Sequence, residues 1–273
     1  MIAIRTTARD CLPCILPVIA ACLWITLSGH DGGHVMAVMA LIGVAATLSS
    51  LAGFAFSALC GAMLFHLNDD PVQVVQILIT CSIANQAAMT WSIRTDIDWR
   101  ALLPYLAGGT LGLIPGIWIL LNVDRGLYMH VLGAFLAING AYRLLGKPMV
   151  LSRKSPLLET IIGFLSGIAG GAAGFPSAFL AVWAGMQGWD KRRQRALLQP
   201  VILILQVAAL LGIALARLAH AAGPAFDAAT LLYIPASLLG TSLGMALYRN
   251  LTDRQFGKAV NLLMLASGLT YAA

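Results

Sequence analysis

The feature that most constrains this chain is a series of long uncharged runs separated by short loops. Most of these runs match the roughly 20 residues that a helix needs to cross a hydrocarbon core about 30 Å thick. The composition agrees, because 59% of the 273 residues are hydrophobic and only 10% are charged, whereas soluble domains carry about 25% charged residues. We therefore expect an all-α polytopic membrane protein. Its candidate helices cover residues 11–29, 35–65, 71–93, 101–121, 126–142, 160–189, 196–216, 228–248 and 255–273.

Two of these runs, 35–65 and 160–189, are too long for a single crossing. A straight helix of about 30 residues would measure about 45 Å, which exceeds the hydrocarbon core. Each run also has a cluster of small or helix-breaking residues near its middle, at 49–54 and at 170–176, where glycine and proline weaken a helix. We therefore predict that each run forms a re-entrant hairpin of two half-helices that enters the membrane and returns to the same side.

The distribution of positive charge favours these hairpins. If the N-terminus is cytoplasmic and each hairpin returns to its own side, all 17 lysines and arginines except Arg125 and Arg217 lie on the cytoplasmic side, as the positive-inside rule requires. A single crossing in each long run would instead place the basic cluster at 143–154 outside. We therefore predict seven full crossings, a cytoplasmic N-terminus and an outer C-terminus. Because the basic residues act as orientation signals, the net charge of +6 does not indicate a nucleic-acid partner.

The two halves of the chain resemble each other in sequence. Residues 52–54 (Ala-Gly-Phe) open the second limb of the first hairpin, and 173–175 repeat them in the second hairpin. Gln86 in the following span matches Gln206. Further along, the pair Gly112 and Gly116 matches the pair Gly240 and Gly244.

These matches predict two inverted-topology repeats within a single membrane domain. Each repeat holds one hairpin and three full crossings, and an odd number of crossings turns the second copy upside down. Secondary transporters have this architecture, with the substrate near the midplane where the repeats meet. The expected organisation is an N-terminal helix and outer loop at 1–34, a first repeat at 35–146, a cytoplasmic linker at 147–156 and a second repeat at 157–273.

The hairpin tips are the predicted binding site. A half-helix that starts at a tip has unpaired N–H groups and a positive dipole end, and two such tips meeting near the midplane would suit a small anion. In this hypothesis backbone amides donate, Ser50 and Ser177 add hydroxyl contacts, and Gln86 and Gln206 are side-chain ligands. The alternative is that the glycines serve helix packing and the glutamines form interhelical hydrogen bonds. The candidate substrate contacts are Ser49, Ser50, Gly53, Phe54, Gln86, Gly171, Gly174, Phe175, Pro176, Ser177 and Gln206, with Arg195 at the cytoplasmic mouth.

Other chemistry is sparse. The only glutamate, Glu159, falls at the cytoplasmic mouth of the second hairpin, so no buried carboxylate relay of the usual kind is visible. If protons drive transport, the substrate itself is then the candidate titrating group. Histidines 30, 34, 66, 130 and 220 follow no metal-binding spacing, so we expect neither a metal nor a cofactor. Two rival functions remain open: a thiol redox enzyme that uses Cys11 and Cys14, and an anion channel.

Several glycine motifs resemble those of a known family. The stretches 163–167 and 170–176, followed by Arg195-Ala196, resemble the sulfite exporter TauE/SafE family of bacterial membrane permeases, and the likeness covers about residues 35–273. The resemblance implies a non-enzymatic exporter in the bacterial inner membrane. Its substrate would be a small organic or sulfur-containing anion such as sulfite or a sulfonate, with protons as the coupling ion. Membrane lipid is the expected surrounding, and a homo-oligomer is compatible with it.

Overall fold

The computed structural model describes residues 32–52, 55–67, 71–124, part of 126–141, 155–219, 226 and 228–272. The predicted helix at 11–29, the cysteines Cys11 and Cys14, and the tip residues Gly53 and Phe54 lie outside the described residues. Within the described ranges the chain is helical and contains no strand, as predicted for an all-α protein.

The described part of the chain contains nine α-helices with defined ends and two short 3-10 helices. Five helices are long and apolar enough to cross a membrane by length and composition, at Val72–Ser92, Trp99–Asn122, Pro156–Ala173, Lys191–Ala219 and Ala228–Tyr248. In chain order the elements are α2 (Gly32–Ala52), α3 (Phe56–Leu67), α4 (Pro71–Ser92), η1 (Arg94–Asp96), α5 (Trp99–Asn122), α7 (Pro156–Ala173), α8 (Ser177–Met186), α9 (Lys191–Ala219), η2 (Ala228–Tyr233), α10 (Ile234–Tyr248) and α11 (Asp253–Ala272).

Both overlong runs are interrupted where the sequence predicted. In the first, α2 ends at Ala52 and α3 begins at Phe56; in the second, α7 ends at Ala173 and α8 begins at Ser177. The limbs are unequal, however. The first limbs, α2 and α7, have 21 and 18 residues and measure about 31 and 27 Å, whereas α3 and α8 have 12 and 10 residues. The prediction of two half-helices per run is therefore corrected: each run has one limb of nearly spanning length and one short limb.

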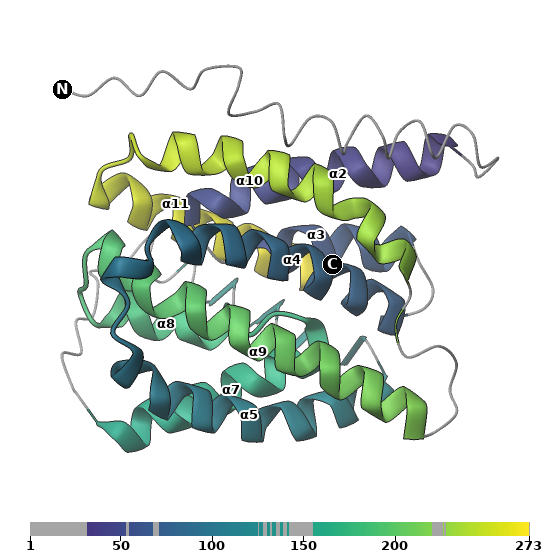
Figure 1. The fold of residues 1–273 in the computed structure, drawn as a ribbon, viewed down its shortest axis with the longest axis horizontal. Coiled ribbons are helices and arrows are strands. Elements are labelled where there is room, and N and C mark those ends of the chain that lie inside the picture. The colour runs from purple at the N-terminus through teal and green to yellow at the C-terminus, as the bar shows by residue number, and fades with distance from the viewer. Residues whose placement is uncertain are drawn as a thin grey trace.

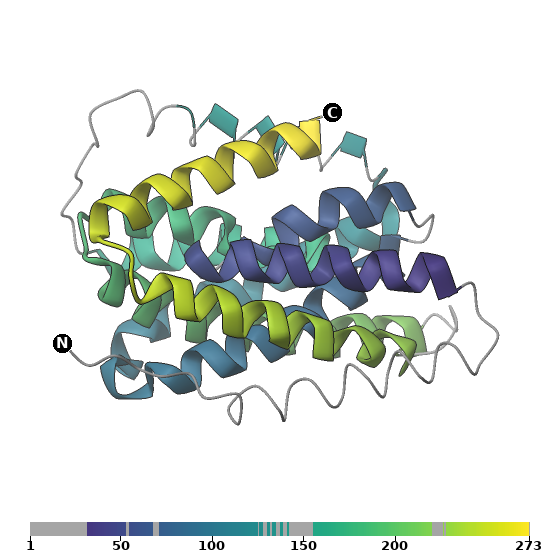
Figure 2. The same cartoon turned by 90° about the horizontal axis from the view of Figure 1, so that it is seen from above.

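The helices form two flanking pairs around a central pair. Figure 1 shows α4 and α9 in the middle of the molecule, with α2 and α10 on one side and α5 and α7 on the other. The contacts agree, because α4 touches α9 and α10, and α9 touches α5. Seen from above in Figure 2, α2 and α10 lie side by side along most of their length. Each flanking pair thus joins the first limb of one half to the glycine-rich helix of the other half.

The flanking pairs are held by direct contact between backbones. A Cβ added to Gly112 of α5 would lie 2.0 Å from the carbonyl oxygen of Phe164 in α7. In the other pair, a Cβ on Gly240 of α10 would lie 2.1 Å from the carbonyl oxygen of Gly43 in α2. The same closeness recurs at Gly108, Gly116, Gly163, Gly167, Gly171 and Gly244. For these glycines the packing alternative is confirmed, since only a residue without a side chain lets the helices approach so closely.

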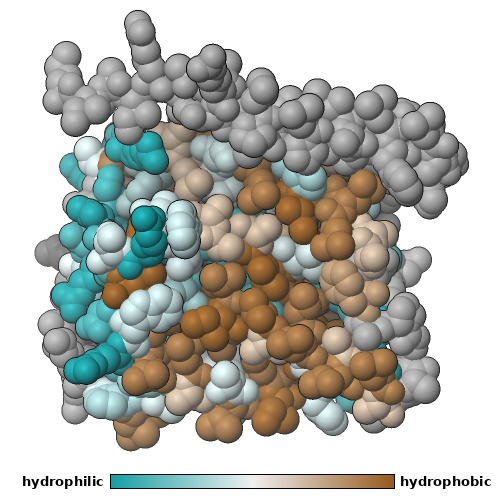
Figure 3. All heavy atoms as spheres, in the orientation of Figure 1, coloured by the Kyte–Doolittle hydropathy of each residue, from teal (hydrophilic) through white to brown (hydrophobic). Residues whose placement is uncertain are grey.

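Many large apolar side chains lie on the outer surface, and several amides and hydroxyls are buried together with the apolar core. Exposed side chains include Leu103 and Ile114 of α5, which are 62% and 70% exposed, whereas Gln86 and Gln199 are at most 1% exposed. In Figure 3 apolar residues cover the middle of the face drawn, and hydrophilic residues gather at one end. In Figure 1 the α4–α5 connection, the start of α9 and the α10–α11 turn lie at this end. Such a surface suits lipid rather than water.

We predict that Gly112→Ala destabilises the protein by about 1–3 kcal/mol, the usual cost of overpacking, because its Cβ would collide with the backbone of α7. The matched control is Gly257→Ala in α11, where an added Cβ meets nothing within 4 Å. The measurement is the thermal unfolding midpoint of each purified variant in detergent. Equal midpoints for Gly112→Ala and wild type would show that the α5–α7 contact does not hold the fold.

Candidate functional site

The second hairpin tip closes its own hydrogen bonds. Gly174 has a φ of 64°, in the left-handed region that favours glycine. Its N–H donates to the carbonyl of Gly170 at 3.0 Å, and the N–H of Phe175 donates to the carbonyl of Ala169 at 3.2 Å. Pro176 has no N–H to offer. The predicted role of Gly174 and Phe175 as amide donors to an anion is therefore wrong for this conformation, because a helix C-cap already uses both groups.

Gln206 connects this tip to the central helices. Its Nε2 donates to the Ser82 hydroxyl of α4 at 2.9 Å and lies 3.4 Å from the carbonyl oxygen of Gly174. The interhelical alternative thus holds for this amide nitrogen. Its Oε1 has no hydrogen-bond partner in the described part of the protein, and the residue is 1% exposed. Gln206 therefore keeps a buried acceptor beside the tip.

Arg195 is a candidate site residue that lies deeper in the protein than the sequence predicts. It was predicted at the cytoplasmic mouth, yet it lies in the second turn of α9 and is only 2% exposed. Its guanidinium donates to the carbonyl of Ser50 in α2 and stacks on Tyr248 of α10, with Cζ 3.5 Å from the ring centroid. Its Nε has no hydrogen-bond partner among the residues that the structure describes. Within the described residues Arg195 makes no ion pair, so a cation is buried without a carboxylate.

Unpartnered neutral groups lie on the elements around Arg195. The Ser50 hydroxyl has no hydrogen-bond partner in the described part of the chain and is fully buried near the end of α2, six residues before α3 begins. Gln199 lies one turn further along α9, is 0% exposed, and finds no partner for either amide atom among the described residues. A Cβ on Gly244 would approach the Ser50 Cβ to 2.6 Å, which leaves no room for a side chain there. We use the name charged site for the group formed by Arg195 and its surroundings, Ser50, Gln199 and Tyr248.

Arg195 and Gln206 make their contacts at different levels of α9. Arg195 contacts Ser50 near the end of α2, whereas Gln206 contacts Gly174 at the second tip. These two side chains are eleven residues apart on α9, which corresponds to about 16 Å along its axis. Gln199 lies between them on α9, and the neighbouring helix α4 carries further buried polar groups. We call this series of buried polar groups the polar path.

The other predicted contacts have separate roles. Gly171 packs against α5, because its Cβ would lie 2.7 Å from the amide nitrogen of Ile117, so it does not line open space. The Ser49 hydroxyl donates a hydrogen bond to the carbonyl of Ala46 in its own helix at 3.1 Å. Gln86 is buried on α4. Phe175, Pro176 and Ser177 are buried at the second tip.

Two members of the charged site, Gln199 and Tyr248, are not among the contacts predicted from sequence, and one of them had a detectable sequence signal. Gln199 follows Arg195 by four residues on an apolar helix, so both face the same side. Tyr248 carried no comparable signal, because it sits at the far end of a different helix. A third interior contact, from the Ser237 hydroxyl to Asn85 Oδ1 at 2.9 Å, joins α10 to α4.

A cavity of about 520 Å³ opens on the other side of α9. Its polar lining comes from Asp96 and Asp98 before α5, Tyr105 on α5, Glu159 on α7, Gln187 after α8 and Arg193 on α9. We call it the vestibule. Its α9 residues are 193, 196 and 197, whereas Arg195 faces α2 and α10. Helix α9 therefore separates the vestibule from the charged site.

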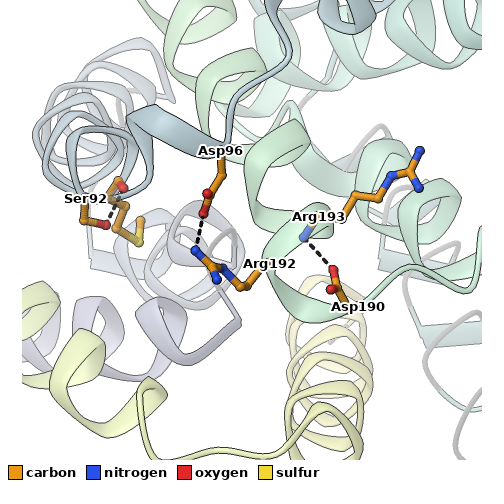
Figure 4. Close-up of polar contacts among 6 residues, drawn as sticks. Ser92, Asp96, Asp190, Arg192 and Arg193 are labelled. Atoms are coloured by element: carbon orange, nitrogen blue, oxygen red, sulfur yellow. Dashed lines mark hydrogen bonds and ion pairs between the residues drawn. The ribbon is translucent and has the colours of Figure 1, made fainter. Parts of the chain in front are cut away.

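Hydrogen bonds order the polar end of the molecule around the vestibule. Arg192 pairs with Asp96 at 2.8 Å and so ties the start of α9 to η1 (Figure 4). The Asp190 carboxylate accepts from the N–H of Arg193 at 2.8 Å and caps α9. Asp98 accepts in the same way from the first amides of α5. On the opposite side, Lys191 donates to the carbonyl of Leu251 in the α10–α11 turn.

The long apolar helices, the lipid-compatible surface and the polar interior define a polytopic membrane protein. The sequence matches the family described as sulfite exporter TauE/SafE over residues 38–271, and the chain therefore belongs to this family of membrane transporters. No curated protein and no solved structure matches the chain.

We predict that Gly174→Ala lowers stability by about 1–2 kcal/mol, the cost of a side chain in the left-handed region. The added Cβ would also lie 3.3 Å from Ile79 Cγ1. Gly43→Ala is the matched control, because a Cβ at this helical glycine would make only an ordinary contact at 3.6 Å. Thermal unfolding in detergent compares the two variants. A midpoint for Gly174→Ala that equals that of Gly43→Ala would contradict the strained tip.

Proposed function

We propose that this protein is a secondary transporter that exports a small sulfur-containing or organic anion, such as sulfite or a sulfonate, by alternating access. The observation that carries the proposal is the buried Arg195, which has no carboxylate partner among the described residues. Membership of the sulfite exporter TauE/SafE family supports the substrate class.

A buried guanidinium without a counter-ion favours an anionic ligand. Removing a charge from water is costly unless it is paired and hydrogen-bonded. The carbonyl of Ser50 and the ring of Tyr248 compensate Arg195 only in part, because neither carries a full negative charge. An oxyanion would supply that charge, since a guanidinium fork matches the geometry of such oxygens. The Ser50 hydroxyl and the Gln199 amide are the neutral donors that we assign to the same anion.

The contact pattern supports the inverted repeat that alternating access needs. The pairs α5–α7 and α10–α2 correspond to each other, as do α5–α9 and α10–α4, and α8–α9 and α3–α4. Under the match of Gln86 with Gln206, Arg195 corresponds to Val75. Val75 lies against Gly174, as Arg195 lies against Ser50. The two ends of the path are therefore related in structure and differ in charge.

This asymmetry supports a charged site at one end of the polar path. Basic side chains gather at the same end, in the α4–α5 and α10–α11 connections and in the first turns of α9, so we assign this end to the cytoplasm by the positive-inside rule. We also propose a bacterial inner membrane, a cytoplasmic N-terminus and an outer C-terminus, as the sequence predicts. In this arrangement an anion leaving the cytoplasm meets Arg195 first and then the neutral amides of Gln199 and Gln206.

We predict that Arg195→Gln lowers ³⁵S-sulfite transport in proteoliposomes at least about 10-fold, and that Arg195→Lys retains part of it. The loss of one charge-assisted contact of about 1.5–3 kcal/mol corresponds to roughly this factor. Arg249→Gln, which removes an exposed cation one residue beyond Tyr248, should leave transport unchanged. Correct insertion of each variant is checked by its elution profile in detergent.

The same vesicles separate the proposal from its rivals. If the variant with Cys11 and Cys14 replaced by serine transports sulfite at the wild-type rate, the thiol redox mechanism is excluded. Sulfite counterflow, in which internal unlabelled sulfite drives accumulation of external label, distinguishes a transporter from a channel. Full activity in Arg195→Gln would refute the charged site.

A further inference from the structure

The vestibule contains a hydrogen-bond chain that the charged site does not use. Trp183 Nε1 on α8 donates to the Tyr105 hydroxyl on α5 at 2.7 Å, and a side-chain hydrogen bond joins Tyr105 to Glu159 on α7. Trp183 and Tyr105 are 5% and 2% exposed, whereas Glu159 is half-buried and lines the cavity. The chain therefore runs from the cavity wall into the protein interior.

More carboxylates than cations line the vestibule, so it does not suit an anionic substrate. Asp96, Asp98 and Glu159 line it, with Arg193 as the facing cation. Arg192, outside the cavity lining, is paired with Asp96. Helix α8, which also packs on α7, carries no charged residue. A cavity with an excess of carboxylates repels anions and raises the local proton concentration.

Gln187 is a second polar residue of the vestibule whose hydrogen bonding can respond to the protonation state of Glu159. It is 8% exposed, lines the cavity, and its Nε2 has no hydrogen-bond acceptor among the described residues. This amide is a donor held at the wall that Glu159 shares. It can donate to the Glu159 carboxylate, and such a hydrogen bond is stronger when the carboxylate is ionised than when it is protonated.

We propose that Glu159 is the cytoplasmic binding site of the coupled proton, and that Tyr105 and Trp183 transmit its protonation state to α8. This inference rests on the proposed transport function. When Glu159 is ionised, Tyr105 donates to a full negative charge, and charge-assisted hydrogen bonds are about twice as strong as neutral ones. When Glu159 takes up a proton, this bond weakens, and so does the attachment of the short limb α8 to the tightly packed α5–α7 pair.

Two ligands thus use opposite faces of α9. The anion binds beside Arg195, and the proton binds at Glu159 in the vestibule. Helix α8 begins three residues after Gly174, whose carbonyl lies near Gln206. A change in the packing of α8 would therefore alter the contacts of Gln206 in the polar path. Exchange of anion for anion needs no net proton movement, whereas net export against a gradient does.

The test uses full-length protein in proteoliposomes loaded with ³⁵S-sulfite, with protein-free vesicles subtracted. Wild-type net efflux should rise at least about 5-fold when the exterior is made acidic. Glu159→Gln should lose this stimulation while sulfite–sulfite exchange at equal pH stays within about 2-fold of wild type. Tyr105→Phe, which keeps the carboxylate but removes the hydroxyl, should also lose the stimulation.

Asp98→Asn is the matched control. It removes a carboxylate from the same cavity, and asparagine caps a helix as well as aspartate does, so acid stimulation should persist. A Glu159→Gln variant that is still stimulated by external acid overturns the inference, and so does one that also loses exchange. Wild type that exchanges sulfite without any response to pH refutes the proton site alone. Wild type that moves no sulfite under either condition refutes the proposed function instead.

Discussion

The structure depends on backbone contact between helices that the two halves of the chain contribute to each other. In lipid, apolar side chains give little reason for helices to associate, because the solvent is as apolar as they are. Close packing has to supply the attraction, and glycine allows it. At Gly112 and Gly240 the carbonyl of the neighbouring helix lies about where a side chain would begin. Since α5 pairs with α7 and α10 with α2, neither half can complete its packing alone.

These rigid flanks allow a polar interior. Helices α4 and α9 lie between the flanking pairs and carry buried amides and hydroxyls that lipid could not satisfy. One charged residue, Arg195, is buried among them in the second half, and Val75 occupies the matching place in the first half. Under the proposed repeat, the two halves would therefore differ in charge at this place. The carboxylates are kept apart from this guanidinium, on the opposite face of α9, where they line the vestibule.

Sequence patterns located the helix breaks well and their limbs poorly. The glycines and proline at 170–176 interrupt a helix through local backbone preferences, so the break between Ala173 and Ser177 was predictable. The start of α7 was placed too late because the expected span was bounded by Glu159, the nearest charge. In the fold Glu159 belongs to the first turn of that helix, since the vestibule and Tyr105 accommodate its carboxylate. For the same reason the next predicted span begins only at 196, which left Arg195 outside the membrane interior.

What the sequence determined by itself is the class of protein, the position of both breaks, the glycine pattern shared by the halves and the family resemblance. All of these depend on composition or on residues close together in the chain. The burial of Arg195 was decided by tertiary structure, because Ser50 lies 145 residues away in sequence and Tyr248 belongs to another helix. Tertiary structure also decided the separation of the Ser50 and Gly174 contacts along α9, whereas the cap that uses the Gly174 and Phe175 amides is local. Local preference can break a helix, but only the packing of distant helices determines which polar groups remain for a ligand.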